Sequence, residues 1–376
     1  MSPQAIAILL DSAPITWTSQ EDRQLKLCEA LVARGVLPVL VFSEDLKSEF
    51  AARLRSTGAE LAAINYGQGV RNYLRELRKL VEKYSITTAH IIFFDYFSPV
   101  PWIARFAGIR NIIYEMQNSG EFRATSWKKA LLQLRTKLTS GPMTRVIAIS
   151  EFVKAQLLKG GLAEDKIVVR YLGVDTERFI PDPAAREQWA RTFDVGGDEL
   201  ILSTVSYLRP FKNPQVLVET CKELSARKIS ARLFVAGDGE MLPSLRELSK
   251  QLNVADRIHW LGNVPDPKSL LQASDIFVLA SVGEAFGLVL AEAMACGVPI
   301  VGSRSGSLLE VVQEGQTGLL ATPLEAKAFA DAIEILAGDV KLRKKMGRQA
   351  VEHVRAKFTV EKAVEETIRV YESLWS

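Results

Sequence analysis

The stretch IFVLASVGEAFGLVLAEAMACGVPIVGS, residues 276–303, holds the pattern that decides the fold. It begins with a short apolar run, Ile276–Ala280, which is typical of a strand buried on both faces. After a glycine-containing turn, a helix is predicted over Gly287–Cys296, and the glycine and proline that follow stop it. A second apolar run, Ile300–Gly302, predicts the next strand. A strand, a helix and a further strand in this order form the repeating unit of a parallel α/β sheet.

The same alternation fills the rest of the chain in two series. In the first, the predicted strands and helices are Ala5–Leu10, Arg23–Arg34, Leu37–Phe42, Val70–Tyr84, Ala89–Phe94, Asn111–Tyr114 and Val146–Ile149. In the second, they are Leu200–Ser206, Pro214–Ala226, Ala231–Ala236, Met241–Leu252, Ile258–Leu261 and Lys268–Ala273, followed by the unit quoted above. The residues after Ala326 are predicted to be helical to the end of the chain.

The two series predict an α/β fold with two Rossmann-like, doubly wound domains. The polar, proline-containing stretch Arg170–Arg186 between them is interpreted as the linker. We expect one domain over residues 1–172, a second over 173–355, and a final helix over 356–376 that packs back on the first domain. The carboxyl ends of both sheets are expected to face a central cleft, because ligands bind there in such folds.

The composition excludes several classes of protein. Of the 376 residues, 48% are hydrophobic and 24% charged, as in ordinary globular proteins. A formal net charge of +3 does not indicate nucleic-acid binding, which requires a concentrated basic face. The three cysteines and three histidines are scattered without metal or disulfide spacing. No apolar run approaches the roughly 18 residues of a spanning helix, and the first one reads as a strand rather than a signal peptide, so a cytoplasmic protein is expected.

Two carboxylates flank the start of the helix in the quoted stretch. Glu284 lies in the turn before the helix, and Glu292 lies inside it among apolar residues, where an unpaired charge is costly. The first N–H groups of the helix, at Leu288 and Val289, lack intrahelical acceptors and carry the positive end of the helix dipole. Gly287 allows a ligand to approach this backbone. The helix start therefore predicts a site for a phosphate or diphosphate. Taken singly, the two acids could be a solvated loop acid and a paired core acid, but their order around this helix start argues against that interpretation.

Several segments resemble a known family. EAFGLVLAEAMACGVPIV, which runs from Glu284 through Glu292, closely resembles the E-x7-E motif of retaining glycosyltransferases of family 4, which have the GT-B fold. The resemblance continues in SRSGSLLEVVQEGQTGLL, ADRIHWLGNVPD and FVAGDGE, and reaches back to SEFVKAQLL and KIVVRYLGVDTERF. It is dense in the second half of the chain and sparse in the first. It implies transfer of a hexose from a nucleotide sugar, with UDP as the expected nucleotide, retention at the anomeric carbon, and no other cofactor.

The resemblance also implies roles for the residues of the motif. Glu284 would hydrogen-bond hydroxyls of the donor sugar, and Glu292 would bind the ribose hydroxyls of the nucleotide. Ribose binding would account for a carboxylate inside an apolar helix. The diphosphate would be held by the start of the helix, at Phe286, Gly287, Leu288 and Val289.

A basic segment is expected beside the diphosphate. VSYLRPFKNPQVLVE, residues 205–219, stands where the family usually has G-R-L-x3-K, and Lys212 matches the lysine that neutralises the leaving diphosphate. Tyr207 replaces the usual arginine and Ser206 the usual glycine, while Arg209 can supply the missing charge. Taken alone, both cations could lie in a solvated turn. No Asp-x-Asp pair follows a strand, so the helix dipole and these two cations are expected to stabilise the leaving group without a metal ion.

Three further loops are candidates for ligand contact. Gly237 belongs to a Gly-Asp-Gly-Glu turn after a predicted strand, a pattern that alone is a weak signal. The segment that contains Gly262, Asn263 and Val264 resembles the one that frames the nucleotide base, with ordinary packing as the alternative. The loop after the motif supplies Ser305 and Glu310 for contacts with the sugar or phosphate.

The first half of the chain departs from the family at two places. Asp11–Gln24 lacks the glycines usual after the first strand, and Gln117 and Asn118 stand where His-Asn or His-Gly is expected. A glutamine forms hydrogen bonds but does not titrate near neutral pH. Glu121 and Arg123 in the same loop are candidate acceptor contacts. The acceptor remains unassigned at this stage.

The segment from Phe122 to Arg145 combines basic residues with Trp127 and several leucines, and contains no acid. Two interpretations stand side by side: a basic amphipathic helix on an anionic membrane surface, or a helix with its apolar side in the core and a solvated basic face. The first suits a lipid-linked acceptor, cell-envelope polysaccharide or glycolipid synthesis, and a peripheral place at the inner face of the membrane.

Other functions of the same fold stay open. A GT-B epimerase would release free epimerised sugar without an acceptor, whereas a phosphorylase would need a pyridoxal-phosphate lysine, to which nothing in the sequence points. A non-catalytic partner that binds nucleotide or lipid is the third alternative, and Gln117 and Tyr207 support it most. Such a partner would bind UDP without hydrolysis or transfer.

Overall fold

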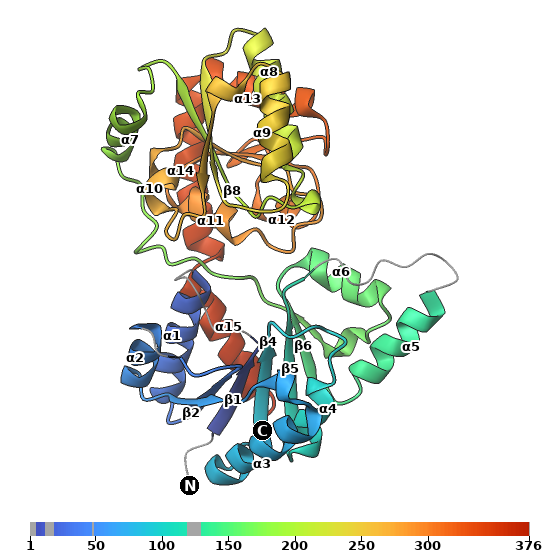
Figure 1. Ribbon diagram of the computed structural model, residues 1–376. Helices are drawn as coiled ribbons and strands as arrows, with labels where there is room; N and C mark the ends of the chain where they lie inside the picture. The colour runs from blue at the N-terminus through green and yellow to red at the C-terminus, as the bar shows by residue number, and fades with distance from the viewer. Residues whose placement is uncertain (1–4, 12–18, 47–48, 119–128, 376) are drawn as a thin grey trace. The chain divides into compact units, whose positions relative to one another are not determined.

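The computed structural model describes residues 5–11, 19–46, 49–118 and 129–375. The chain divides into two compact units: Met1–Gly173 together with Val360–Ser376, and Val174–Thr359. Each unit is a parallel sheet with helices on both faces, as Figure 1 shows. Among the helices of the described ranges, none combines the length and the apolar character needed to cross a membrane.

The sheet of the first unit has the strand order β3-β2-β1-β4-β5-β6-β7, and every pair of neighbours is parallel. The strands are β1 Ala5–Leu10, β2 Leu37–Phe42, β3 Glu60–Ala63, β4 Thr88–Ile92, β5 Asn111–Met116, β6 Arg145–Ala148 and β7 Ile167–Val169. The helices are α1 Ser19–Val32, α2 Glu49–Ser56, α3 Val70–Tyr84, α4 Val100–Phe106, α5 Lys129–Thr139, α6 Glu151–Lys159 and α15 Val360–Glu372, with short 3-10 turns at Tyr66–Gln68 and Glu164–Lys166. Helices α1, α2 and α15 lie on one face of this sheet, and α3 and α4 on the other (Figure 1).

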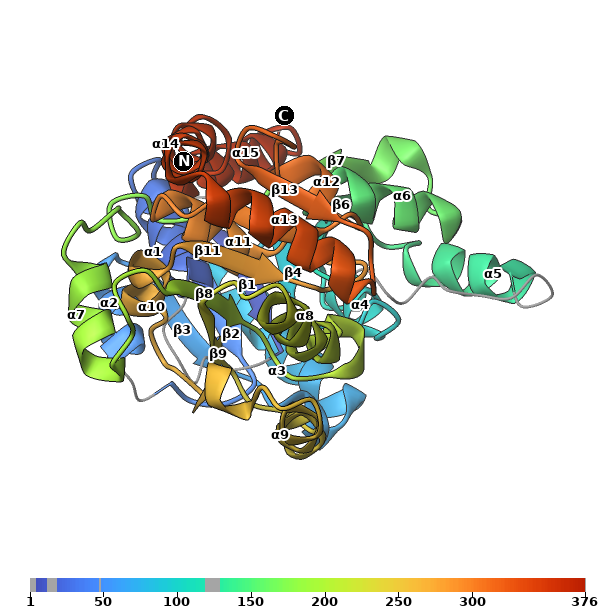
Figure 2. The same cartoon turned by 90° about the horizontal axis from the view of Figure 1, so that it is seen from above.

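The sheet of the second unit has the order β10-β9-β8-β11-β12-β13 and is also parallel. Its strands are β8 Leu200–Val205, β9 Ala231–Ala236, β10 Ile258–Gly262, β11 Ile276–Leu279, β12 Ile300–Ser303 and β13 Gly318–Ala321. Its helices are α7 Ala185–Phe193, α8 Pro214–Ala226, α9 Leu242–Gln251, α10 Lys268–Ala273, α11 Leu288–Ala295, α12 Leu308–Val311, α13 Ala326–Gly338 and α14 Val340–Lys357. Figure 2 shows α8, α9 and α13 on one side of this sheet, and α10, α11 and α14 on the other.

Strand order locates the site within each unit. In the first sheet the chain reverses direction across the sheet between β1 and β4, and in the second between β8 and β11. The loops that leave the carboxyl ends of these strands diverge at such a point and open a crevice for ligands. The strands themselves are apolar because helices cover both of their faces.

The C-terminal helix α15 completes the first unit rather than the second. Its buried residues Val360, Val364, Ile368 and Tyr371 join the same hydrophobic cluster as Ile6 and Ile8 of β1. Ion pairs at the surface connect it to α1 and to the turn after α1, from Lys26 to Glu361 and from Arg34 to Glu365, the latter at 2.7 Å.

Most predicted elements match the structure within two residues, but three strands were not predicted. The missed strands are β3, β7 and β13, each of three or four residues and at or near a sheet edge. Such strands carry too few residues for a hydrophobic period to stand out. The residues at both ends of the predicted linker, Arg170–Arg186, belong to the folded units instead. Arg170 is 1% exposed in the core of the first unit, and Ala185 begins α7.

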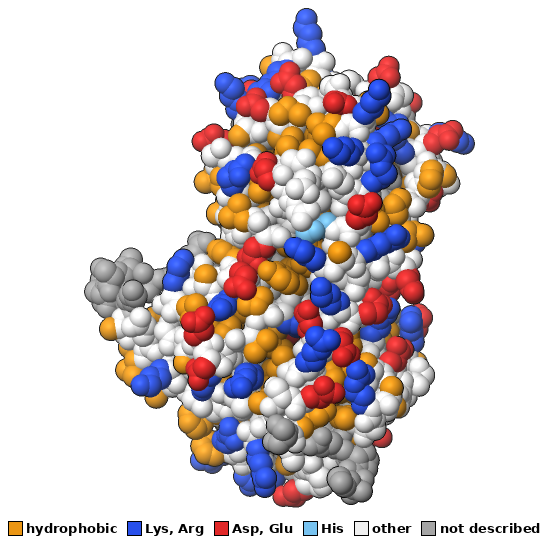
Figure 3. All heavy atoms as spheres, turned by 180° about the vertical axis from the view of Figure 1, so that it is seen from behind, with side chains coloured by type: hydrophobic (Ala, Val, Ile, Leu, Met, Phe, Trp, Pro, Cys, Tyr) orange, Lys and Arg blue, Asp and Glu red, His pale blue; other side chains and the backbone are white. Residues whose placement is uncertain are grey.

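Charge on the surface is mixed. On the face that Figure 3 shows, basic and acidic side chains are interspersed, and hydrophobic ones reach the surface between them. This agrees with a formal net charge of only +3 and gives no sign of a broad field of one sign on that face.

Candidate functional site

Four loops of the second unit meet at the carboxyl edge of its sheet. They follow β8, β9, β11 and β12, and parallel strands bring their carboxyl ends to the same edge. The amide of Leu208 donates to the carbonyl of Asp238 at 3.0 Å, which joins the first two loops. The amide of Val282 donates to the carbonyl of Phe211 at 3.3 Å, which joins the first and the third.

Helix α11 begins at this edge with backbone donors that have no partner within the helix. Gly287 caps it with φ 79°, and the amides of Leu290 and Ala291 donate to the Gly287 carbonyl at 2.9 and 3.3 Å. The amides of Leu288 and Val289, one step earlier, have no intrahelical acceptor, as at every helix start. With the positive end of the helix dipole, they form a local site for an anion.

Glycine is favoured at the cap of this helix. A φ of +79° is strained for a residue with a side chain, and a Cβ at Gly287 would lie 3.3 Å from the Cγ of Glu284. The glycine therefore serves both the turn and the close packing of the acid beside it.

Lys212 and Glu284 meet beside the helix start. Lys212 lies in a 3-10 turn after β8, and its Nζ donates to Oε2 of Glu284 at 2.6 Å. Their side chains are 17% and 15% exposed, so both are shielded from solvent. Asn213 ends this turn with φ 49°. Its Nδ2 donates to the carbonyl of Ala280 at 3.5 Å, which connects the end of the turn to the residue that follows β11. A shielded, charge-assisted contact of this length holds both side chains in place.

The loop after β12 is hydrogen-bonded to the turn that carries Glu284. The amide of Ser307 donates to the carbonyl of Glu284 at 3.0 Å, and the amide of Gly283 donates to Oγ of Ser305 at 3.1 Å. A Cβ at Gly306 would lie 2.7 Å from the Glu284 nitrogen, so only glycine allows this approach. Ser305 thus has a structural contact of its own, while Glu310 lies half-buried on α12.

Glu292 lies in the middle of α11 and is 6% exposed. Its helix neighbours Ala291 and Ala293 are fully buried. Burial raises the pKa of the nearby Cys296 thiol to about 12, and the Glu292 charge adds to the effect. That thiol therefore stays protonated at physiological pH and has no nucleophilic character.

The Gly-Asp-Gly-Glu turn has a packing explanation. A Cβ at Gly237, which has φ 137°, would lie 1.9 Å from the carbonyl oxygen of Ser206, and the Gly237 amide donates to Gly262 at 2.7 Å. Gly262 has φ 68° with open space at its Cβ position. Asn263 is exposed, and Val264 packs on a small cluster around Phe234.

Arg209 stands apart from the ion pair. Its guanidinium lies 5.6 Å from the ring centroid of Tyr207, which is 70% exposed. Among the ion pairs of the described ranges, Glu284 pairs with Lys212 and not with Arg209, so Arg209 is a second cation near the turn rather than part of the pair.

The sequence analysis missed a group of buried hydroxyls at the same edge. They lie at or just after the ends of β8, β11 and β12, and in the described part of the chain none has a hydrogen-bond partner: Thr204, Ser281, Ser303 and Ser307. A polar residue that closes an otherwise apolar strand is the signal that points to them.

The carboxyl edge of the first unit holds a buried charged network centred on Glu115 of β5. Arg23 of α1 donates to its Oε2 at 2.9 Å, and Arg170 contacts the same oxygen. His90 of β4 lies 3.4 Å from that oxygen, and its Nδ1 is 2.7 Å from the hydroxyl of Tyr371 on α15. The C-terminal helix is therefore tied to the centre of this sheet.

The protonation of the network follows from its neighbours. Burial alone would raise the pKa of Glu115, but the Arg170 and Arg23 guanidinium groups hold that pKa well below 4.5. Burial lowers the pKa of His90 despite the adjacent carboxylate, so this histidine is neutral at pH 7. Burial also lowers the pKa of Arg170 to about 10, which leaves it charged.

Gln117 lies at the rim of this network. Its Nε2 donates to Oε1 of Glu115 at 2.6 Å, and its Oε1 accepts from Nε2 of Gln20 at 3.5 Å. The hydrogen bond to Glu115 therefore fixes the orientation of the Gln117 side-chain amide. Asn118 follows and is exposed, whereas Glu121 and Arg123 lie outside the described residues.

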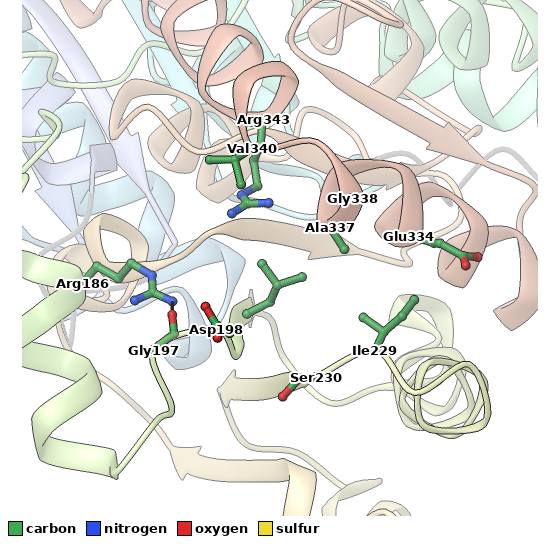
Figure 4. A pocket seen from close by; sticks show the side chains of 11 residues that line it. Arg186, Gly197, Asp198, Ile229, Ser230, Glu334, Ala337, Gly338, Val340 and Arg343 are labelled. Atoms are coloured by element: carbon green, nitrogen blue, oxygen red, sulfur yellow. Dashed lines mark hydrogen bonds between the residues drawn. The ribbon is translucent and has the colours of Figure 1, made fainter.

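Neither edge holds a metal-binding group among the described residues, since no cluster of three or more His, Cys, Asp or Glu occurs in them. The second unit also has a pocket of about 580 Å³ at the opposite, amino-terminal edge of its sheet, shown in Figure 4. Arg186 points into it and donates to the carbonyls of Gly197 and Glu199. The candidate functional residues lie instead at the carboxyl edges of the two sheets.

Two family models match the chain. The model described as "Glycosyl transferases group 1" matches residues 185–353, all within the second unit. The model described as "Glycosyltransferase Family 4" matches residues 22–178, which cover most of the first unit. Together the two models cover every strand of both sheets except β1.

Curated relatives cover part of the chain. It is 36% identical over 184 residues to N-acetyl-alpha-D-glucosaminyl L-malate synthase of Bacillus anthracis, which is 49% of this chain and 48% of the relative. It is 34% identical over 200 residues to D-inositol 3-phosphate glycosyltransferase of Corynebacterium glutamicum, which is 51% of this chain and 48% of the relative. The chain thus spans about half the length of these relatives.

Solved structures share the fold over the whole chain. A glycosyltransferase from Rickettsia africae has a TM-score of 0.83 at 21% identity and covers 100% of both chains. HepE from Anabaena in complex with UDP and glucose has a TM-score of 0.82 at 18% identity, covering 98% of this chain and 100% of that one. With one family model on each unit and this fold, the chain belongs to the GT-B glycosyltransferases of the family 4 type.

Proposed function

We propose that this protein transfers a hexose from a nucleotide sugar to an acceptor hydroxyl with retention at the anomeric carbon. The observation that carries the proposal is the Lys212–Glu284 pair beside the open amides of Leu288 and Val289. The cation and the amides can bind a diphosphate, and the carboxylate can accept hydrogen bonds from the hydroxyls of a sugar. UDP is the proposed nucleotide, supported by the fold shared with HepE from Anabaena, whose structures contain UDP and UDP-glucose.

In this proposal the second unit binds the donor. The amides at the start of α11, together with Phe286 and Gly287, hold the diphosphate, and Glu292 accepts hydrogen bonds from the ribose hydroxyls. Glu284 accepts hydrogen bonds from the donor sugar. Lys212 has three N–H donors, so it can retain Glu284 and still contact a phosphate oxygen.

The proposed chemistry rests on stabilising the leaving group. As the bond between the anomeric carbon and the diphosphate oxygen breaks, negative charge grows on that oxygen, and Lys212 and the helix start are placed to offset it. The acceptor hydroxyl forms the new bond on the same face and its proton passes to the departing diphosphate, so the protein supplies positioning rather than a nucleophile. Arg209 adds a second positive charge near the turn. We propose that no metal ion is required.

The first unit is the proposed acceptor side. Gln117 and Asn118 at the end of β5 are the described residues that would contact the acceptor, and Glu121 and Arg123 are carried forward from the sequence. Gln117, oriented by Glu115, offers a fixed hydrogen bond but no titratable group. The proposed setting is synthesis of a cell-envelope polysaccharide or glycolipid at the inner face of the membrane.

A ligand screen tests the proposal. Unfolding temperature and calorimetric binding are measured with UDP, GDP, ADP and their hexose conjugates, and we expect UDP and UDP-hexose to raise the unfolding temperature most. Incubation of the UDP-hexose with an acceptor panel, followed by proton NMR of the product, gives the anomeric configuration. An inverted product would contradict retention. Activity lost in EDTA and restored by Mn²⁺ would contradict metal independence.

One alternative has an observation in its favour. Gln117 cannot titrate near neutral pH, and Tyr207 stands in place of a usual arginine, which suits a non-catalytic subunit that binds a nucleotide. Tight UDP binding with neither hydrolysis nor transfer across a broad acceptor panel would favour this alternative. Transfer to any acceptor would exclude it.

A further inference from the structure

Helix α5 of the first unit exposes its leucines to solvent, unlike an ordinary surface helix. Its leucines Leu131, Leu134 and Leu138 are 67%, 55% and 60% exposed. The small polar residues Thr136 and Thr139 of the same helix are buried instead. A surface helix normally turns its apolar stripe to the core, so this arrangement calls for something apolar outside. For these leucines, the interpretation of a core-facing apolar side is wrong.

Helix α4 extends the same apolar surface. Nε1 of Trp102 donates to the carbonyl of Leu138 at 2.9 Å, which joins the two helices. The rings of Trp102 and Phe106 lie 6.0 Å apart, and Phe106 is 62% exposed. The five side chains Trp102, Phe106, Leu131, Leu134 and Leu138 are defined here as the apolar face. Exposed apolar side chains that gather in this way mark an interaction surface more often than isolated ones do.

The segments that form the apolar face carry positive charge. The two segments that carry it, residues 96–114 and 129–145, contain no aspartate or glutamate. Their exposed cations include Arg110, Arg135 and Lys137. The Arg135 guanidinium lies 3.9 Å from the ring centroid of Phe97, which holds it beside the leucines.

The charge and the exposed apolar side chains of this surface favour one kind of partner. A second copy of the chain would bring the same exposed cations of these two segments close to one another, which is unfavourable. An anionic bilayer accepts leucine and phenylalanine side chains below its head groups, tryptophan at the interface, and basic residues beside the phosphates. Each arginine or lysine near an anionic surface strengthens such binding.

We propose that the apolar face of α4 and α5 docks the first unit on an anionic lipid surface. This deepens the proposed membrane contact, which the sequence limited to residues 122–145, by adding Trp102 and Phe106 of α4. It rests on the proposed function only in its setting, since docking requires no nucleotide sugar. A bilayer on this face would present a lipid-linked acceptor to the unit that we propose binds acceptors.

Co-sedimentation of the full chain with vesicles tests this inference without any substrate. Vesicles of phosphatidylcholine alone are compared with vesicles that also contain phosphatidylglycerol. We expect binding to the anionic vesicles only, weakened by salt. The triple variant L131Q/L134Q/L138Q should bind the anionic vesicles at least roughly tenfold more weakly than the wild type, because it removes three apolar side chains from the interface. Phe106→Gln should weaken binding in the same direction and tests the part of α4.

A matched control uses exposed apolar residues of the second unit. Leu324 and Ile335 are 57% and 54% exposed, and L324Q/I335Q should leave vesicle binding unchanged. Far-UV circular dichroism and the unfolding temperature establish that each variant is folded. Equal binding by wild type and triple variant, or equal binding to neutral and anionic vesicles, would overturn the inference. A dimer that dissociates in the triple variant, without vesicle binding, would assign the face to a second copy. Donor binding, measured separately, keeps the transferase proposal independent.

Discussion

Nζ of Lys212 lies 2.6 Å from Oε2 of Glu284, although the two residues are 72 positions apart in the chain. The contact forms because Lys212 follows β8 and Glu284 follows β11, and these strands are neighbours across the point where the sheet reverses its order. One side chain is suited to a phosphate and the other to sugar hydroxyls. Their pairing at a helix start is the geometric centre of the proposed donor site.

Replacing the cation tests leaving-group stabilisation. Lys212→Ala is expected to lower kcat by about 10²–10³-fold, because a donor aimed at developing charge in a shielded site is lost. Initial rates of UDP release at saturating donor measure the effect. Lys222→Ala, on an exposed position of α8, is the control and should leave the rate unchanged. Wild-type turnover in Lys212→Ala would remove this residue from the mechanism.

Ribose recognition by Glu292 has a double test. Glu292→Ala should raise the Kd of UDP by roughly tenfold or more, since a buried charge-assisted hydrogen bond is lost. Glu284→Ala should instead act mainly on turnover. Calorimetry is run with UDP and with 2′-deoxy-UDP. Wild type should prefer UDP, whereas Glu292→Ala should bind both alike. A preserved preference in the variant would disprove the assignment.

The glycine of the turn after β9 is expected to be structural. Gly237→Ala should lower the free energy of unfolding by about 1–3 kcal/mol, because its Cβ would fall 1.9 Å from the Ser206 carbonyl and its φ of 137° is strained for alanine. Gly338→Ala is the matched control, with no atom within 4 Å of its Cβ. Urea unfolding of both variants gives the comparison. Equal stability would show that the turn relaxes without cost.

Acid should weaken the first unit through Glu115. Its pKa is held well below 4.5 in the folded state, so the unfolded state binds the proton more readily. The stabilisation is therefore complete above pH of about 4.5 and is lost as the pH falls from there toward the folded-state pKa. Urea unfolding across this range should show stability decreasing with acidity.

Glu115→Gln separates this effect from general acid unfolding. The variant should be less stable at pH 7 by about 3–5 kcal/mol, because it leaves Arg23 and Arg170 buried without their carboxylate. Below a pH of about 4.5, the free energy of unfolding of this variant should change less with pH than that of the wild type. An unchanged pH slope would mean that other carboxylates cause the acid sensitivity. Surface Glu361→Gln serves as the control, since Glu361 is exposed.

The sequence predicted the local arrangement at the start of α11, but not the contacts that surround Gln117. Glu284, Gly287 and the start of α11 are local features of one strand–turn–helix segment, so their arrangement is written in consecutive residues. Gln117 is different, because its orientation depends on Glu115, Gln20 and two arginines from separate elements. Gly237 and Ser305 looked like ligand contacts in the sequence, yet each also has a backbone partner that explains it.

By itself the sequence determined the α/β alternation, the helix N-terminus between two acids, and the membership of the family, because these depend on local periodicity and on residues close in the chain. The tertiary structure alone decided that Lys212 pairs with Glu284, that Arg170 is buried against Glu115 rather than in a linker, and that α5 turns its leucines outward. Each of these depends on which strands are neighbours and on which face of a helix is covered. Burial and long-range contact, unlike periodicity, are properties of the folded chain.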